Sequence, residues 1–234
     1  VFDPAGGYLF KFGSWGVGTG EFHYPNAVAV DSTGQIYVAD WGNLRIQVFD
    51  QTGGYLFQFG RAYGTGVAVD STGRILVVGE FAGRDVDVFD ATGRFQFKFG
   101  AWNPAAPGQF YNPFDVVVDS AGRIIVADVF SLVNSDAVDR IQVFDSAGTF
   151  RFTFGGVDSV RGVAVDSSGI IFVTEGDSSY GEHTEGDDVK VFASTGAFLF
   201  KFGSYGSAPG QFDEPGGVAV DANRIYVADS GNQR

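Results

Sequence analysis

Several residue types are scarce in this sequence. It has no cysteine, no methionine, only two histidines, and no apolar run of the roughly 18 residues that a membrane-spanning helix needs. Without cysteine there is no disulfide, thiol nucleophile or thiolate metal site. Because no apolar run is long enough to span a bilayer, we expect no membrane insertion. The two histidines leave little scope for imidazole-based catalysis or zinc binding.

Basic residues are also few. The chain has 15 Lys and Arg against 28 Asp and Glu, for a formal net charge of -13. Nucleic-acid binding draws its affinity from clustered Lys and Arg, so we expect no nucleic-acid partner. The 44% apolar content is that of a folded chain, and 234 residues suffice for one domain with a sizeable core. The acidic balance favours a cationic partner and binding that weakens as salt is added.

The residues in excess are 35 glycines and 25 phenylalanines, and both follow an internal repeat. The phrase Val-Ala-Val-Asp, or a near copy, begins at residues 28, 67, 116, 163 and 218, at intervals of 39 to 55 residues. Each copy continues through a Gly-containing turn into a second apolar run, and later into a third and a fourth run joined by another Gly turn. This pattern predicts four antiparallel strands per repeat.

Repeats of four short strands are typical of β-propellers, whose blades fan around an axis. The predicted fold is all-β: a single propeller domain over residues 1–234, with blades starting near residues 28, 67, 116, 163 and 218. Phenylalanines recur on the third strands, as at Phe49, and at alternate positions on the fourth strands, as at Phe57 and Phe59. We expect these rings to fill the space between the outer edges of neighbouring blades.

Two copies of the repeat resemble a known family. The segments Ile36 to Phe49 (IYVADWGNLRIQVF) and Ile225 to Arg234 (IYVADSGNQR) are similar to the NHL repeat. The other copies are looser, with Glu80 where an Asp belongs and Asp188 where an Arg belongs. The resemblance implies a propeller, but NHL domains serve binding proteins, lyases and signalling receptors alike, so function does not follow from it.

The two ends of the chain match parts of one repeat. Arg234 corresponds to Arg45, and the segment 1–3 corresponds to 48–50. We expect residues 1–13 to complete the last blade and so to close a ring of five blades. The alternative is a piece of a six-bladed NHL propeller.

Length variation is confined to one side of the predicted ring. The turns between strands one and two, and between strands three and four, are short and alike, whereas the other connections vary and share the opposite face. Loops held on a rigid scaffold commonly carry function. This loop face is therefore the candidate binding face, for a protein, peptide or glycan. The ligand-binding residues that we predict are Asn26, Asp115, Arg161, Glu175, His23 and Trp41.

A carboxylate ends every predicted second strand, and we expect most of these to pair with an Arg of the same blade: Asp40 with Arg45, Asp128 with Arg140, Asp229 with Arg234, and Glu80 with Arg84. The fourth repeat lacks such an Arg and has an acidic loop instead. An oxygen-rich, flexible loop suits Ca²⁺ better than Zn²⁺. The candidate metal ligands are Asp177, Glu182, Glu185, Asp187 and Asp188, and no other cofactor is predicted.

A non-catalytic interaction scaffold, extracellular or at the cell surface, is the main functional prediction. The lyases that share the repeat hold zinc through histidines around the channel, and no His precedes the inner strands here. Gluconolactonase-like propellers use Glu, Asn and Asp around a divalent ion, and Asn26, Asp115 and Glu175 offer such groups near Arg161. A metal-dependent hydrolase or lyase of that type is therefore the first alternative. A self-assembling structural protein is the second.

Overall fold

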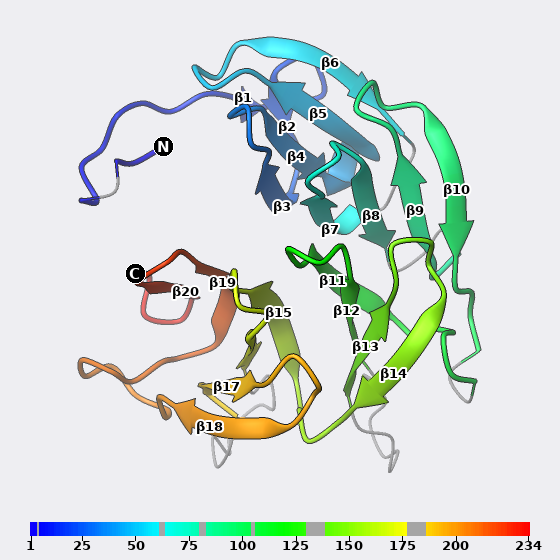
Figure 1. The fold of residues 1–234 in the computed structure, drawn as a ribbon. Coiled ribbons are helices and arrows are strands. Elements are labelled where there is room, and N and C mark those ends of the chain that lie inside the picture. The colour runs from blue at the N-terminus through cyan, green and yellow to red at the C-terminus, as the bar shows by residue number, and fades with distance from the viewer. Residues whose placement is uncertain (4, 61–63, 80–82, 104–105, 130–138, 177–185) are drawn as a thin grey trace.

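The computed structural model describes residues 1–234 apart from residues 4, 61–63, 80–82, 104–105, 130–138 and 177–185. The described residues form strands joined by turns, and the one helical element among them is a 3₁₀ turn at Trp41–Asn43. Five sheets, numbered here as blades 1 to 5, fan around a central opening (Figure 1). The predicted propeller of antiparallel four-stranded blades is confirmed.

Four of the blades have four strands in sequential order. Blade 1 consists of β3 (Pro25–Val30), β4 (Ile36–Asp40), β5 (Arg45–Phe49) and β6 (Tyr55–Phe59). Blade 2 consists of β7 (Gly64–Val69), β8 (Ile75–Gly79), β9 (Val86–Phe89) and β10 (Phe95–Phe99). Blade 3 consists of β11 (Pro113–Val118), β12 (Ile124–Asp128), β13 (Arg140–Phe144) and β14 (Phe150–Phe154). Blade 4 consists of β15 (Val160–Val165), β16 (Ile171–Glu175), β17 (Asp188–Phe192) and β18 (Phe198–Phe202).

The first strand of each blade lies innermost (Figure 1). Blade 5 has two strands, β19 (Pro215–Val220) and β20 (Ile225–Asp229), and a short parallel ribbon of β1 (Ser14–Trp15) and β2 (Glu21–Phe22) precedes blade 1. The middle strands β4, β12 and β16 are buried along their whole length. Because neighbouring blades cover both faces of such strands, they are apolar at consecutive positions.

The hairpin turns are held by aspartates that bind their own backbone. In the turn between β5 and β6, Asp50 Oδ1 accepts hydrogen bonds from the backbone N–H of Thr52 at 2.8 Å and of Gly54 at 2.9 Å. Gly53 has φ 82°, a left-handed conformation that glycine adopts without strain. The same arrangement recurs at Asp90 and Asp145. This repeated turn explains why one face of the ring, the turn face, is uniform.

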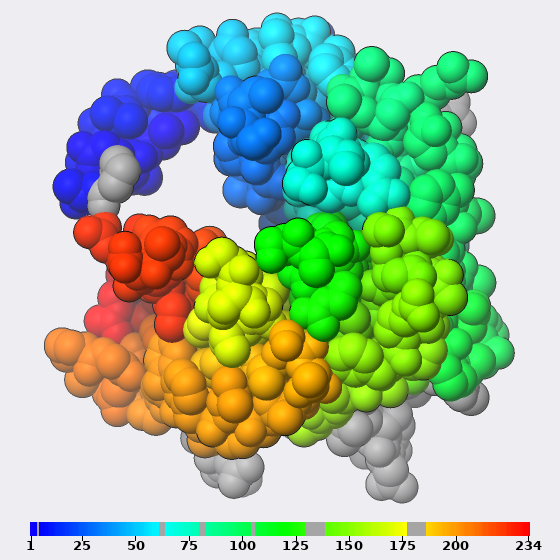
Figure 2. Space-filling view, in the orientation of Figure 1, coloured from blue at the N-terminus to red at the C-terminus, as the bar shows by residue number. Residues whose placement is uncertain are grey.

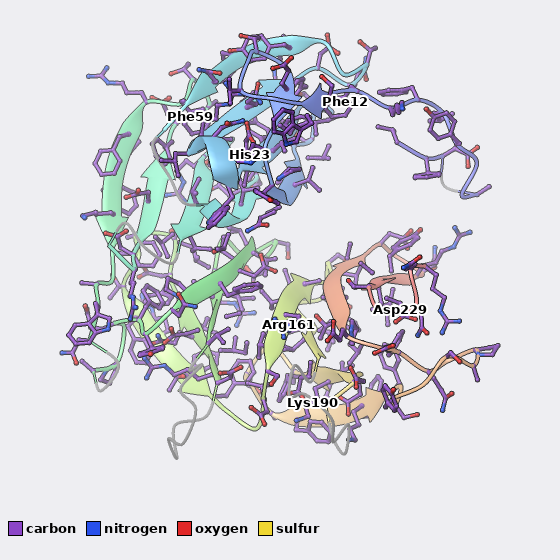
Figure 3. The ribbon with its side chains drawn as sticks, turned by 180° about the vertical axis from the view of Figure 1, so that it is seen from behind. Phe12, His23, Phe59, Arg161, Lys190 and Asp229 are labelled. Atoms are coloured by element: carbon purple, nitrogen blue, oxygen red, sulfur yellow. The ribbon has the colours of Figure 1, made fainter. Side chains whose placement is uncertain are left out.

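Phenylalanine rings fill the seams between neighbouring blades, as predicted. In three seams a ring from the fourth strand of one blade packs on a ring from the third strand of the next, with centroids 4.9 to 5.0 Å apart. Phe12 of the N-terminal segment packs on blade 1 in the same way, at 4.8 Å. The four pairs are Phe12–Phe49, Phe59–Phe89, Phe99–Phe144 and Phe154–Phe192. Figure 3 labels Phe12 and Phe59 at two of these seams.

The ring differs from the expectation at its ends. Among the described residues β20 pairs with β19 alone, so the described part of segment 1–13 does not complete blade 5 as third and fourth strands. Instead, residues 1–3 pair with residues 7–10 as a separate hairpin, in which Phe2 pairs with Tyr8 and Leu9 N donates to Val1 O at 3.0 Å. This hairpin runs into Phe12, which packs on blade 1. That contact anchors the N-terminal segment at the blade 1 side of the gap.

An opening therefore separates blade 5 from blade 1 (Figure 2). The inner-strand valine that packs on the preceding blade is nearly inaccessible in blades 2, 3 and 4, where Val67, Val116 and Val163 are 5%, 1% and 2% exposed. Its equivalent in blade 1, Val28, is 64% exposed. Tyr226 of β20 faces the same opening and is also exposed.

Candidate functional site

A cavity of about 1070 Å³ occupies the centre of the ring. Its wall is built from the inner strands β3, β7, β11, β15 and β19, with β20 and Phe2 at the opening between blades 5 and 1. Polar groups that line it include Asn26, Thr65, Asp115 and Arg161. We call this the central cavity. It combines rigid apolar walls with a few charged and hydrogen-bonding groups, which is the usual composition of a ligand site.

Asp115 lies on β11 and joins two blades. Its carboxylate accepts hydrogen bonds from Val116 N and from Val163 N of blade 4, both at 2.9 Å. Gly66 of blade 2 allows this close approach, because a Cβ there would lie 2.9 Å from Asp115 Cα. Burial raises the pKa of Asp115 to about 6, against the opposing effect of the two backbone hydrogen bonds.

Asn26 and Arg161 lie at the start of their inner strands, next to the loop face. Asn26 is exposed, and Arg161 is partly exposed, with its Nε donating to Gly176 O at 3.4 Å. Figure 3 labels Arg161 on the inner strand of blade 4. The structure thus places three predicted ligand-binding residues, Asn26, Asp115 and Arg161, in the wall of the central cavity.

Glu175 lies elsewhere. It is buried at the end of β16, where Lys190 Nζ pairs with Oε2 at 2.9 Å and Asp158 N donates to Oε1 at 2.8 Å. Burial raises the pKa of Glu175 to about 7, although Lys190 lowers it. Both carboxylate oxygens of Glu175 are thus held inside blade 4, and the residue does not line the central cavity.

His23 and Trp41 belong to an aromatic cluster on the loop face of blade 1, completed by Trp15 and Tyr24. The His23 ring lies 4.6 Å from that of Tyr24 and 6.0 Å from that of Trp15, and Tyr24 lies 6.4 Å from Trp41 (centroid distances). Trp15 and Tyr24 are 81% and 67% exposed. We call these four residues the blade 1 aromatic cluster. Sequence reasoning missed Trp15 and Tyr24, although aromatic residues recur in the same loop of blades 3 and 5, at Trp102 and Tyr205.

The predicted ion pairs are present in three blades. Arg45 pairs with Asp40 at 2.8 Å, Arg140 with Asp128 at 2.9 Å, and Arg234 with Asp229 at 2.7 Å. Asp40 also accepts hydrogen bonds from His23 N and from the Asn43 side chain, so it fixes the loop that carries the aromatic cluster. These carboxylates are therefore structural. Of the predicted pair of Glu80 with Arg84, Glu80 lies outside the described residues.

Most of the predicted calcium loop also lies outside the described residues, namely Asp177, Glu182 and Glu185. Of its other members, Asp187 accepts a hydrogen bond from Glu214 N at 3.0 Å, and Asp188 pairs with Lys201 at 2.7 Å. Within the part of the chain that the structure describes, no three or more His, Asp or Glu side chains are grouped to hold a metal ion. No described helix is long and apolar enough to cross a membrane.

The sequence matches one family model in two segments and one known protein over a longer span. The family model of the NHL repeat matches residues 22–49 and 212–234. Over 157 residues the chain is 32% identical to the protein brain tumor of Drosophila melanogaster, a match that covers 63% of this chain and 14% of that protein. The chain therefore spans a small part of the length of this relative.

Solved structures share the architecture at low identity. A nidogen–laminin complex matches with a TM-score of 0.64 and 16% identity, over 88% of this chain and 72% of that chain. A gluconolactonase from Xanthomonas campestris matches with a TM-score of 0.66 and 18% identity, over 91% of this chain and 74% of that chain. Hydrazine synthase of Kuenenia stuttgartiensis matches with a TM-score of 0.66 and 14% identity, over 88% of this chain and 62% of that chain. These likenesses establish the fold alone. Two segments of the chain, residues 22–49 and 212–234, thus match the NHL repeat, and they lie within a β-propeller fold.

Proposed function

We propose that the chain is a binding scaffold that docks a protein or peptide on its loop face, over the mouth of the central cavity. The observation that carries this proposal is the central cavity itself, in which Asn26 and Arg161 stand at the start of rigid inner strands. A side chain of the partner would enter the cavity, where Asp115 and Arg161 offer opposite charges. NHL propellers commonly bind proteins, which supports this assignment.

The partner is expected to be cationic. The chain carries a formal charge of -13. Many of the aspartates that hold turns, such as Asp50 and Asp90, have pKa values lowered by hydrogen bonds from their own turn, so they stay ionised at neutral pH. Such a field attracts cations over a Debye length and loses its reach as salt is added.

Selection from a random peptide library tests this proposal. Peptides enriched on the wild-type chain are expected to carry basic residues, and their affinity should fall when salt is raised from about 0.05 to 0.5 M. Asn26→Trp, which fills the mouth of the central cavity, and Arg161→Glu should each change their affinity by about tenfold or more.

The matched control is Gln51→Ala, an exposed position on the turn face, which should leave affinity unchanged. If no peptide is enriched, or if enriched peptides bind both cavity variants as they bind the wild type, the proposal is wrong.

A further inference from the structure

One contact within the chain places an arginine side chain over an aromatic ring. The guanidinium carbon of Arg84, from the blade 2 segment, lies 5.0 Å from the ring centroid of Tyr111, in the loop before blade 3. This distance is that of a cation–π contact.

Tyr111 occupies the same repeat position as His23. The sequence Phe110-Tyr111-Asn112-Pro113 aligns with Phe22-His23-Tyr24-Pro25. Each residue donates its backbone N–H to the carboxylate that ends the second strand: Tyr111 to Asp128 at 2.8 Å, and His23 to Asp40 at 2.7 Å. The loops of blades 3 and 1 thus hold their aromatic residues against equivalent anchors.

At blade 1 four aromatic residues lie together, and Arg45 of the same blade is already engaged. Arg45 Nε binds Asp40, one terminal nitrogen binds Gln58, and the other binds the carbonyls of Gly18 and Glu21. Two ring pairs of the cluster meet edge to face, at 88° between Trp15 and His23 and at 75° between Tyr24 and Trp41, and the His23–Tyr24 pair is tilted by 40°. Trp15 and Tyr24 are 81% and 67% exposed, and among the described residues no arginine lies over either ring.

We infer that the blade 1 aromatic cluster binds an arginine side chain of a peptide partner, whose guanidinium stacks on the rings of Trp15 and Tyr24. This inference rests on the proposed function, and it names the chemistry that the partner presents. Arginine suits the site better than lysine because its planar, weakly hydrated guanidinium stacks on aromatic faces. The excess of acidic residues in the chain also favours a cationic partner. The contact of Arg84 with Tyr111 is an example of the same interaction within the chain.

The test uses tryptophan fluorescence and short peptides of defined composition. Trp102→Phe leaves Trp15 and Trp41 as the reporting indoles, since the chain has three tryptophans. A Gly/Ser peptide with several arginines is titrated in parallel with peptides in which lysine or glutamate replaces every arginine. The arginine peptide is expected to bind most tightly and the glutamate peptide not at all.

Variants then locate the site. Trp15→Ala and Tyr24→Ala are each expected to weaken binding of the arginine peptide roughly 2- to 30-fold, the range of one cation–π contact. Trp102→Ala removes an indole of similar exposure, 62%, from the equivalent loop of blade 3, and should have no effect when binding is followed by calorimetry. All three side chains are exposed, so unchanged thermal melting is expected and confirms the fold.

Two results separate failure of this inference from failure of the proposed function. If peptides selected on the loop face respond to Asn26→Trp but carry no arginine and ignore Trp15→Ala and Tyr24→Ala, the scaffold function stands and the arginine site is wrong. If the glutamate peptide binds as well as the arginine peptide, or if Trp102→Ala weakens binding as much as Trp15→Ala does, the arginine site is again wrong. If no peptide is enriched on the wild-type chain, the proposed function fails with it.

Discussion

Carboxyl groups in this protein fall into two classes that differ by environment. Aspartates in the hairpin turns, such as Asp50, accept several hydrogen bonds near solvent, and these lower their pKa. Asp115 and Glu175 are desolvated between strands, and their pKa values are raised to about 6 and about 7. Hydrogen bonding near solvent thus favours the ionised carboxylate in the turns, whereas burial disfavours it at Asp115 and Glu175.

The raised pKa values predict a pH dependence at the residue scale. The folded chain keeps these two protons at pH values where the unfolded chain, with ordinary carboxyl groups, has released them. Their contribution to the free energy of unfolding is therefore largest below pH 4 and is lost as pH rises through about 6 for Asp115 and about 7 for Glu175. A ¹³C NMR titration of the side-chain carboxyls should show both midpoints.

Spectra of Asp115→Asn and Glu175→Gln assign the two signals, because each variant lacks one of them. Asp50, whose pKa is lowered, is the internal reference and should titrate below its ordinary value near 3.8. Midpoints below pH 5 for both Asp115 and Glu175 would contradict the burial that the structure gives them.

Part of the site could be predicted from residue positions. Asn26, Asp115 and Arg161 were identifiable because the starts of the inner strands surround the axis of a propeller, and all three line the central cavity. Glu175 was predicted to offer its carboxylate to the channel although it ends a second strand. Its partner in the structure, Lys190, comes from the middle of β17 and not from the position where the repeat places Arg. Tyr24 escaped notice because its contact with His23 depends on a left-handed backbone conformation, φ 51°, that no sequence pattern reports.

At the scale of the strand and the turn, a phenylalanine ring packs on a turn glycine of the neighbouring blade at each seam. A Cβ on Gly93, in the turn between β9 and β10, would lie 2.5 Å from Phe59 Cγ of the preceding blade. Gly53, Gly148 and Gly196 meet Phe12, Phe99 and Phe154 in the same way. Glycine is therefore required at these turns both for its left-handed φ and for the ring that lies on it.

Gly93→Ala is expected to destabilise the chain by two additive effects. The left-handed conformation costs an alanine about 1 kcal/mol, and overpacking against Phe59 adds about 1 to 3 kcal/mol. Gly6→Ala is the matched control, because Gly6 has φ 82° in the same type of turn but nothing within 4 Å of the added Cβ. Urea unfolding should therefore show the larger loss for Gly93→Ala. Equal losses in the two variants would mean that the seam has no steric role.

The strands themselves were predictable in blades 1 to 4, because turn aspartates and glycines bracket each apolar run. The parallel ribbon of β1 and β2 was not, since two-residue strands have no periodicity to detect. Its neighbour, the 3₁₀ turn Trp41–Asn43, reads in sequence as an ordinary loop.

At the scale of the whole molecule, the sheets form an open arc. Blade 3 is covered on both faces, whereas blade 5 has a neighbour on one side, and β20 is largely exposed where β12 is fully buried. Burial of this kind sets the free energy of local opening.

Hydrogen exchange should follow this gradient along the arc. Backbone amides of β12 and β13 are expected to exchange only through global unfolding, and those of β19 and β20 several orders of magnitude faster through local opening. Mass spectrometry of proteolytic fragments measures both sets in one experiment. Protection of β20 equal to that of β12 would show that blade 5 is flanked on both sides in solution.

Ring closure was the least predictable feature. The match of segment 1–3 to segment 48–50 is real, and the turn at Asp3 has the same hydrogen bonds as the turn at Asp50. Sequence equivalence shows that two segments can adopt the same hairpin. It does not show that β20 and the hairpin meet, because the tilt between successive blades sets that separation and is a property of the packed seams.

The opening beside Val28 also bears on how the central cavity responds to a ligand. A closed ring resists dilation at every seam at once, whereas an interrupted one can widen by small rotations at each Phe–Phe contact. A peptide that contacts both β3 and β20 would bridge the opening and fix the distance between blades 1 and 5. Tight binding would then also stiffen the propeller.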